Sequence, residues 1–106
     1  MASKPENRKI RPWIILYGHR PMYCTSKKED CSWKHNKLKN GFPPSNRFAL
    51  EDLLFLTGVD LAFWGHMHNY QRTLPIFNNK IYNVSCKDVY INPGATVHII
   101  TGAAVS

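Results

Sequence analysis

The sequence lacks any long hydrophobic run, and its first residues lack the apolar core of a signal peptide. The apolar stretches at residues 13–17 and 59–64 are far shorter than the roughly 20 apolar residues of a transmembrane helix. Residues 1–11 are polar and basic, whereas a signal peptide carries an apolar segment there. We therefore expect no membrane span, and no signal peptide in the chain as written.

Acidic side chains are scarce, with 7 Asp and Glu against 14 Lys and Arg and a formal net charge of +7. A basic surface attracts anions such as phosphate esters, nucleic acids or acidic membranes, although a solvated lysine-rich surface gives the same balance. Aromatic residues lie among the lysines, which keeps open a basic nucleic-acid-binding module, but no known nucleic-acid-binding motif accompanies them. We therefore expect no specific nucleic acid partner.

Cysteine is also sparse, with 3 residues in the chain. Cys24 and Cys31 are close enough in sequence to close a short disulfide loop, which needs an oxidising compartment. The glycosylation sequon at Asn83 points to the same compartment. A zinc finger built on the two cysteines and His35 lacks a fourth ligand and the usual spacing. Because no signal peptide is present, one resolution is that the chain is part of a longer secreted protein.

The chain of 106 residues suits one small domain with a modest core. Residues 1–12 are expected to form a mobile basic tail. Residues 13–17 and 59–64 read as buried strands, and Ser45 or Asn46 is expected to cap a helix that runs to about Leu56 between them. The order strand, helix, strand predicts a parallel pair with a crossover helix, which is an α/β arrangement.

The last third of the sequence predicts further strands. Residues 74–77 and 81–84 flank the turn Asn78-Asn79, as in a hairpin whose first strand is confined to an edge by Pro75. Residues 97–101 are expected to form a final strand. His98 lies inside it and is expected to be a packed sheet residue rather than a metal ligand.

Both predicted parallel strands end in glycine followed by histidine. Gly18-His19 follows the first strand, and Gly65-His66-Met67-His68 follows the second. Neutral imidazole is a good ligand for zinc and iron, and ligands gather at the carboxyl ends of parallel strands. Two such junctions in one small chain favour a shared metal site over two ordinary polar loops.

Three segments together resemble the second half of an animal-type purple acid phosphatase, of the kind shared with the high-molecular-weight plant enzymes. They are Gly18–Tyr23, Gly65–Arg72 and Val97–Gly102, and the resemblance spans nearly all of residues 13–103. That family belongs to the calcineurin-like metallophosphoesterases, whose domain is an αββα sandwich. The resemblance implies that residues 13–106 are the C-terminal part of such a domain, about half of it. The strands that should pair with residues 13–17 and 61–64 would then be missing, and we expect apolar faces and edges of the sheet to be uncovered.

The resemblance also implies a site and an activity. The family hydrolyses phosphate monoesters at a dinuclear centre in which iron(III) pairs with zinc, iron(II) or manganese. By the motif match, His19 and His66 would bind the divalent ion and His68 the iron(III). His35 would bind substrate and donate a proton to the leaving group, and Arg72 would lie beside the substrate.

Other expectations follow from the same resemblance. The family's loop after the first histidine can hold a disulfide, which fits Cys24 and Cys31. Family members are secreted or lysosomal glycoproteins, which fits the sequon at Asn83.

One part of the family pattern is missing. The family's first three ligand motifs, which include the carboxylate that bridges the two metals, have no counterpart before His19. Three histidines without that carboxylate would hold at most one divalent ion. We therefore expect a phosphatase part that is inactive alone and that would need the missing N-terminal half of its domain. A non-catalytic metal-binding or interaction module is the alternative.

Overall fold

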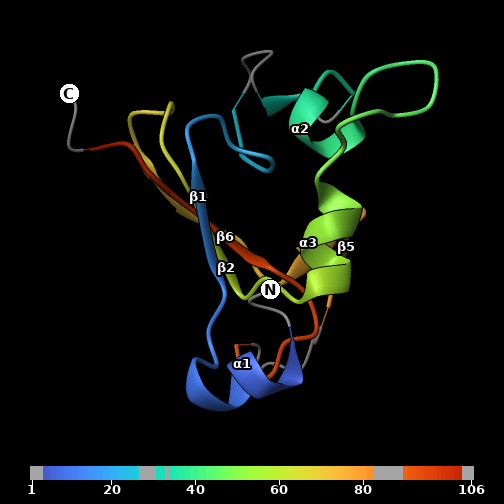
Figure 1. The fold of residues 1–106 in the computed structure, drawn as a ribbon. Helices are drawn as coiled ribbons and strands as arrows, with labels where there is room; N and C mark the ends of the chain where they lie inside the picture. Colours follow the sequence, from blue (N-terminus) through green and yellow to red (C-terminus); the bar gives the residue numbers. More distant parts are fainter. Residues whose placement is uncertain (1–3, 27–30, 33, 83–89, 104–106) are drawn as a thin grey trace.

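The computed structural model describes residues 4–26, 31–32, 34–82 and 90–103 (Figure 1). The strands β1, β2, β6 and β3 form one sheet in that spatial order, and β4 and β5 form a separate hairpin. The elements in chain order are α1 Pro5–Ile10, β1 Ile15–Gly18, α2 Lys37–Asn40, α3 Glu51–Thr57, β2 Leu61–Trp64, β3 Tyr70–Arg72, β4 Ile76–Phe77, β5 Lys80–Ile81 and β6 Val97–Thr101.

The predicted parallel α/β arrangement is confirmed. β1 pairs in parallel with β2, with Gly18 opposite Trp64, and β2 pairs in parallel with β6. The predicted final strand is β6. The antiparallel strand β3 was not predicted, because its residues follow the histidine loop directly and carry no alternating apolar pattern. The parallel strands therefore end at a common edge of the sheet.

The helix predicted to run to about Leu56 is α3, and it begins later than predicted. Its N-cap is Leu50, so the expectation that Ser45 or Asn46 caps it is wrong. Asn46 and Phe48 have φ angles of 54° and 65°, which a right-handed helix excludes. Gly58 ends α3 in the left-handed conformation and donates its N–H to the last turn of the helix.

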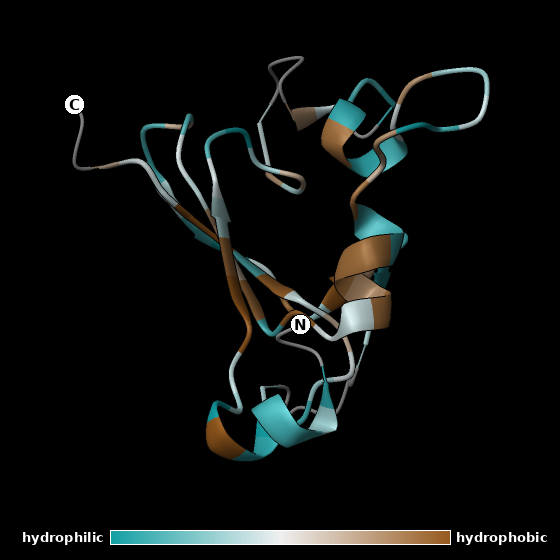
Figure 2. Cartoon of the chain, viewed as in Figure 1, coloured by the Kyte–Doolittle hydropathy of each residue, from teal (hydrophilic) through white to brown (hydrophobic). Residues whose placement is uncertain are grey.

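The core lies between α3 and one face of the sheet, where apolar residues of the strands and the helix meet (Figure 2). Leu16 packs against this core, whereas Ile15 and Tyr17 point to the other face and are 54% and 86% exposed. An apolar sheet face is thus left open, as expected of half a domain, whereas the prediction that residues 13–17 form a buried strand is wrong. The buried cluster comprises Met22, Leu54, Val59, Ala62, Trp64 and Ile100.

The expectation that residues 61–64 lack a strand partner is wrong. β2 is a central strand, with β1 on one side and β6 on the other. The mixed sheet supplies these partners from within the chain because β6 inserts between β2 and β3. Of the two predicted parallel strands, β1 lies at an end of the sheet.

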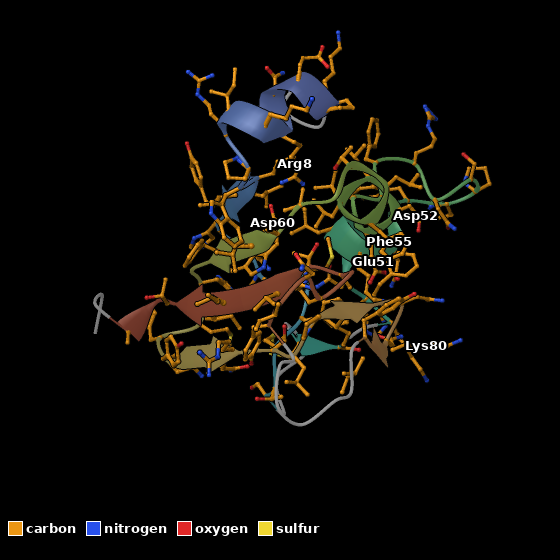
Figure 3. All side chains as sticks on the ribbon, turned by 90° about the horizontal axis from the view of Figure 1, so that it is seen from below. Arg8, Glu51, Asp52, Phe55, Asp60 and Lys80 are labelled. Atoms are coloured by element: carbon orange, nitrogen blue, oxygen red, sulfur yellow. A yellow bond between two sulfur atoms is a disulfide. The ribbon has the colours of Figure 1, made fainter. Side chains whose placement is uncertain are left out.

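Residues 5–10 form a short helix, α1, which the sequence did not predict. Pro5 occupies its first turn, where a missing N–H costs nothing, and Glu6 lies near the positive end of the helix dipole. Arg8 donates to Asp60 at 2.8 Å, and Figure 3 shows the two side chains side by side. The mobility of residues 1–12 stays a prediction.

The predicted hairpin is confirmed in shortened form. Asn78 and Asn79 have φ angles of 50° and 61°, which suit a tight two-residue connection between β4 and β5. Phe77 stacks on Phe55 of α3 with ring centroids 4.1 Å apart, so the hairpin is anchored to the helix. None of the helices in the described ranges is long and apolar enough to cross a membrane.

Candidate metal centre

The ends of β1 and β2 bring two of the predicted ligands together. His66 Nδ1 lies 3.2 Å from His19 Nε2, and the two rings meet edge to face with centroids 5.1 Å apart. The Gly65 N–H donates to the His19 carbonyl at 3.0 Å, which extends the parallel pairing one residue beyond the strands. The register of the sheet therefore fixes the distance between the imidazoles.

The spacing of these nitrogens fits joint coordination of one cation. Two imidazole nitrogens bound to a tetrahedral zinc ion at about 2.0–2.1 Å lie roughly 3.3 Å apart, close to the observed separation. Each neutral ring offers one lone pair, and His19 is exposed while His66 is partly exposed. The two residues can thus hold one divalent ion with coordination positions left open.

His68 does not complete a larger site. It is exposed, and no three His, Cys, Asp or Glu side chains of the described ranges come together as a metal-binding group. The structure therefore unites His19 and His66, whereas binding of iron(III) by His68 stays a prediction.

The loop that carries His66 has a constrained backbone. His66 itself adopts a φ of 62°, a left-handed conformation that is uncommon for residues with a side chain. Gly102, just after β6, approaches the loop so closely that a Cβ there would lie 2.1 Å from the Met67 carbonyl oxygen. The Gly102 N–H also donates to the Asn69 carbonyl at 3.2 Å. The end of β6 thus holds the histidine loop against the sheet.

Trp64 lies directly beneath this centre. Its indole is 3% exposed, and a Cβ on Gly18 would lie 2.7 Å from the ring, so the glycine before His19 leaves space for it. Trp64 Nε1 donates to His98 Nδ1 at 3.0 Å, and the two rings are nearly parallel. The prediction that His98 is a packed sheet residue is confirmed, and burial lowers the pKa of its imidazole to about 4.

A pocket of about 280 Å³ opens beside the histidine pair. His66 and the predicted substrate ligand His35 both line it, which brings together residues far apart in the sequence. Sequence reasoning missed the two cations of the pocket. Their positions in the sequence could have indicated that they lie near the site, because Arg20 follows His19 directly and Lys37 follows His35 by two residues. The remaining lining residues are Pro21, Asn36 and Leu38.

A polar network supports the loop behind this pocket. The Tyr23 hydroxyl donates to Glu51 Oε1 of α3, and Lys39 of α2 lies 3.4 Å from the other carboxylate oxygen. Burial raises the pKa of the Tyr23 phenol well above its usual range, and the hydrogen bond to Glu51 adds to the shift. The Asn78 N–H donates to the same carboxylate at 2.8 Å. Glu51 therefore joins the loop, α2 and the hairpin.

The remaining predicted site residues lie elsewhere or are not described. Arg72 is exposed on β3 with its guanidinium 4.9 Å from the centroid of the Tyr90 ring, and it does not line the pocket. Its role in substrate binding stays a prediction. The predicted disulfide between Cys24 and Cys31 is present, with Cα atoms 5.2 Å apart. The sequon residue Asn83 lies outside the described residues.

Comparison with known proteins agrees with this architecture. A family model for calcineurin-like phosphoesterases matches residues 2–70. The chain is 45% identical to acid phosphatase type 7 of Danio rerio over 97% of this chain and 24% of that protein. It is 47% identical to acid phosphatase type 7 of Mus musculus over 93% of this chain and 23% of that protein.

The fold likewise has a solved counterpart. The structure of a purple acid phosphatase from yellow lupin (Lupinus luteus) seeds aligns with a TM-score of 0.63 at 28% identity, covering 91% of this chain and 16% of that chain. The chain spans about a quarter of the length of the curated relatives named above. The resemblance to purple acid phosphatases is thus confirmed, and the chain belongs to the calcineurin-like phosphoesterase family.

Proposed function

We propose that this chain supplies part of the metal centre and substrate pocket of an enzyme that hydrolyses phosphate monoesters. The observation that carries the proposal is the 3.2 Å separation of His19 Nε2 and His66 Nδ1 at neighbouring strand ends. The pocket beside them is lined by cationic side chains, which suits a phosphate ester. The similarity to acid phosphatases supports the same reaction class.

Each residue has a proposed role. His19 and His66 would hold a divalent ion, which we take to be zinc, iron(II) or manganese, and His68 would hold the iron(III) of a complete centre. A bound cation supplies charge stabilisation for the phosphoryl oxygens and a hydroxide nucleophile. His35 lines the same pocket as His66, where it can donate a proton to the leaving oxygen of the ester.

The described residues supply only part of such a centre. Because they offer no group of three metal-binding side chains, no carboxylate is placed to bridge two cations. We propose that the isolated chain binds at most one divalent ion and does not turn over a monoester alone. Segments bearing the missing ligands, packed against the open face at Ile15 and Tyr17, would complete the domain.

An assay of the full chain with a chromogenic phosphate monoester and added zinc, manganese or iron tests this proposal. We expect metal binding and metal-dependent binding of inorganic phosphate, but no turnover. Turnover that His66→Ala abolishes would contradict the inactivity. Absence of both metal and phosphate binding would contradict the phosphatase role itself. Lys80→Ala, an exposed change on β5, is the matched control.

A non-catalytic module is the second candidate. The observation that favours it is the exposure of Tyr17, at 86%, next to a site where the residues that the structure describes bring two ligands together and no third. Such a module would bind zinc stoichiometrically and would bind no inorganic phosphate in the pocket. The phosphate titration of the zinc-loaded chain therefore separates the two candidates.

We also propose that the chain works in an oxidising compartment, either secreted or lysosomal. The disulfide between Cys24 and Cys31 supports this, because such bonds persist mainly outside the cytosol. Mass spectrometry of the protein from its natural source tests the proposal. We expect an oxidised cysteine pair and a glycan on Asn83, whereas free thiols at both cysteines would contradict it.

A further inference from the structure

We propose that Asn36 is a positioning residue that holds His35 at the pocket, where the imidazole can contact a phosphate group bound beside His66. The inference rests on the proposed function, which makes His35 the proton donor to the leaving oxygen. Asn36 also lines the pocket, but its polar side-chain atoms bond to other parts of the protein. It therefore acts through its neighbour rather than on the substrate.

Three hydrogen bonds hold the side-chain amide of Asn36. Its nitrogen donates to the Pro21 carbonyl at 2.9 Å and to the Met22 carbonyl at 3.1 Å. Its oxygen accepts from the Lys39 N–H at 3.0 Å. A rotated amide would turn the oxygen toward the two carbonyls and the nitrogen toward the Lys39 N–H, so these partners define one orientation of the side chain.

The two carbonyls belong to the segment that directly follows the predicted metal ligand of β1. Pro21 and Met22 come two and three residues after His19, and both are buried. Met22 is also part of the hydrophobic core. The Asn36 side chain therefore joins its own segment to one that core packing holds in place.

His35 depends on such an anchor because its own side chain is exposed. Its backbone N–H donates to the Ser32 carbonyl at 3.1 Å, and the residue that follows it is Asn36. Packing restrains an exposed side chain little, so the place of the imidazole follows that of the backbone. Loss of the two Asn36 donations would let the segment that carries His35 move away from the Pro21 and Met22 carbonyls.

A helix cap alone does not account for this arrangement. The Asn36 oxygen caps α2, and a serine, threonine or aspartate side chain can provide such a cap as well. The donations to two carbonyls need an amide, because a hydroxyl has one hydrogen to donate and a carboxylate has none. Replacing Asn36 with serine therefore separates the two roles: a cap oxygen remains, whereas the bonds to the Pro21 and Met22 carbonyls are lost.

Calorimetric titration of the zinc-loaded full chain with inorganic phosphate tests the inference. We expect Asn36→Ser and His35→Ala each to weaken phosphate binding about fivefold, and the double variant to lose little more, because both changes act through one imidazole. Zinc affinity should stay unchanged in all three variants. Phosphate should also shift the NMR signals of the His35 ring in the wild type, and much less in Asn36→Ser. Asn40→Ser, the same substitution at the last residue of α2, is the matched control.

The outcomes separate this inference from the function on which it rests. His35 signals that phosphate shifts equally in the wild type and in Asn36→Ser overturn the inference and leave the proposed function supported. Additive losses in the double variant, or equal weakening by Asn40→Ser, also overturn it. Failure of the zinc-loaded wild type to bind phosphate contradicts the proposed function, and the inference falls with it.

A measurement on the wild type keeps the test open if Asn36→Ser does not fold. Hydrogen exchange of the Asn36 side-chain amide, followed by NMR, reports whether its two donations persist in solution. We expect both amide protons to exchange slowly, because each is bonded to a carbonyl. Exchange as fast as that of an exposed amide would overturn the inference.

Discussion

At the scale of single residues, a few side chains determine whether the strand ends can hold a cation. The pairing of β1 with β2 sets the spacing of His19 and His66, and the Trp64 ring packs against Gly18, the residue before His19. The indole is in turn oriented by its hydrogen bond to His98. Residues outside the centre therefore contribute to its geometry.

Replacing His98 with phenylalanine removes the acceptor of the Trp64 N–H while keeping an aromatic ring. We expect the free energy of unfolding to fall by about 1–3 kcal/mol, because a buried donor loses its partner. We also expect weaker zinc binding, measured by titration, because the indole beneath the ligands is no longer held. His98→Gln, which keeps an acceptor, should restore most of the affinity. Equal zinc affinity in all three proteins would show that the hydrogen bond does not position the site.

The buried imidazole of His98 also predicts a pH dependence. Its pKa of about 4 lies below the ordinary value of 6.5. Between these two pH values, His98 therefore binds a proton in the unfolded chain but not in the folded chain. This contribution to stability is complete above pH 6.5, falls as pH decreases, and is lost by about pH 4. We expect the free energy of unfolding to fall by roughly 3 kcal/mol across this pH range because of His98.

Urea unfolding between pH 4 and 7 measures the effect, with His98→Gln as the control because glutamine does not titrate in this range. The Tyr23 ring contacts His98, and Glu51 lines the same small cavity as His98; both titratable groups remain in the control. A wild-type profile no steeper than that of the control would contradict the prediction.

At the scale of the elements, the sequence was most informative where its pattern was strong. The apolar runs predicted β1, β2 and β6 and the parallel pairing of β1 with β2, and the two strand–glycine–histidine junctions predicted that His19 and His66 would meet. Tyr70–Arg72 was missed as a strand because its pairing depends on β6, a contact that no local pattern encodes. The start of α3 was predicted too early. Asn46 and Phe48 have positive φ angles and therefore cannot belong to the right-handed helix that follows them.

The site was predictable only in part for a similar reason. His35 was expected near the centre by resemblance, and the pocket brings it to His66. The place of Lys37 in the pocket was missed, because it depends on the hydrogen bonds from Asn36 to the Pro21 and Met22 carbonyls. A tertiary contact of this kind leaves no periodic signal in the sequence.

The contact between β6 and the histidine loop gives a prediction at this scale. In Gly102→Ala the new Cβ would lie 2.1 Å from the Met67 carbonyl oxygen, so the loop must shift. We expect a loss of about 1–3 kcal/mol in the free energy of unfolding and a weaker zinc site. Gly65→Ala is the matched comparison, because its Cβ would meet only an ordinary contact of 3.6 Å to His19. Equal destabilisation by the two changes would contradict this account.

At the scale of the whole molecule, the chain combines a well-formed sheet edge with an open apolar face. α3 covers one face of the sheet, whereas Ile15 and Tyr17 are exposed on the other. Burial of large apolar side chains is a main source of stability, so an open face of this kind suits a surface that packs against further structure. The incomplete ligand set and the uncovered face are therefore consistent with each other.

The most direct test of the central claim is a zinc titration of the full chain. We predict one zinc ion per chain, with affinity reduced at least tenfold by His19→Ala or His66→Ala and unchanged by Lys80→Ala. Because the two ligands bind the same ion, the double variant should lose little more zinc affinity than either single variant. Undiminished binding of one zinc ion by the double variant would contradict the claim that these two imidazoles form the site.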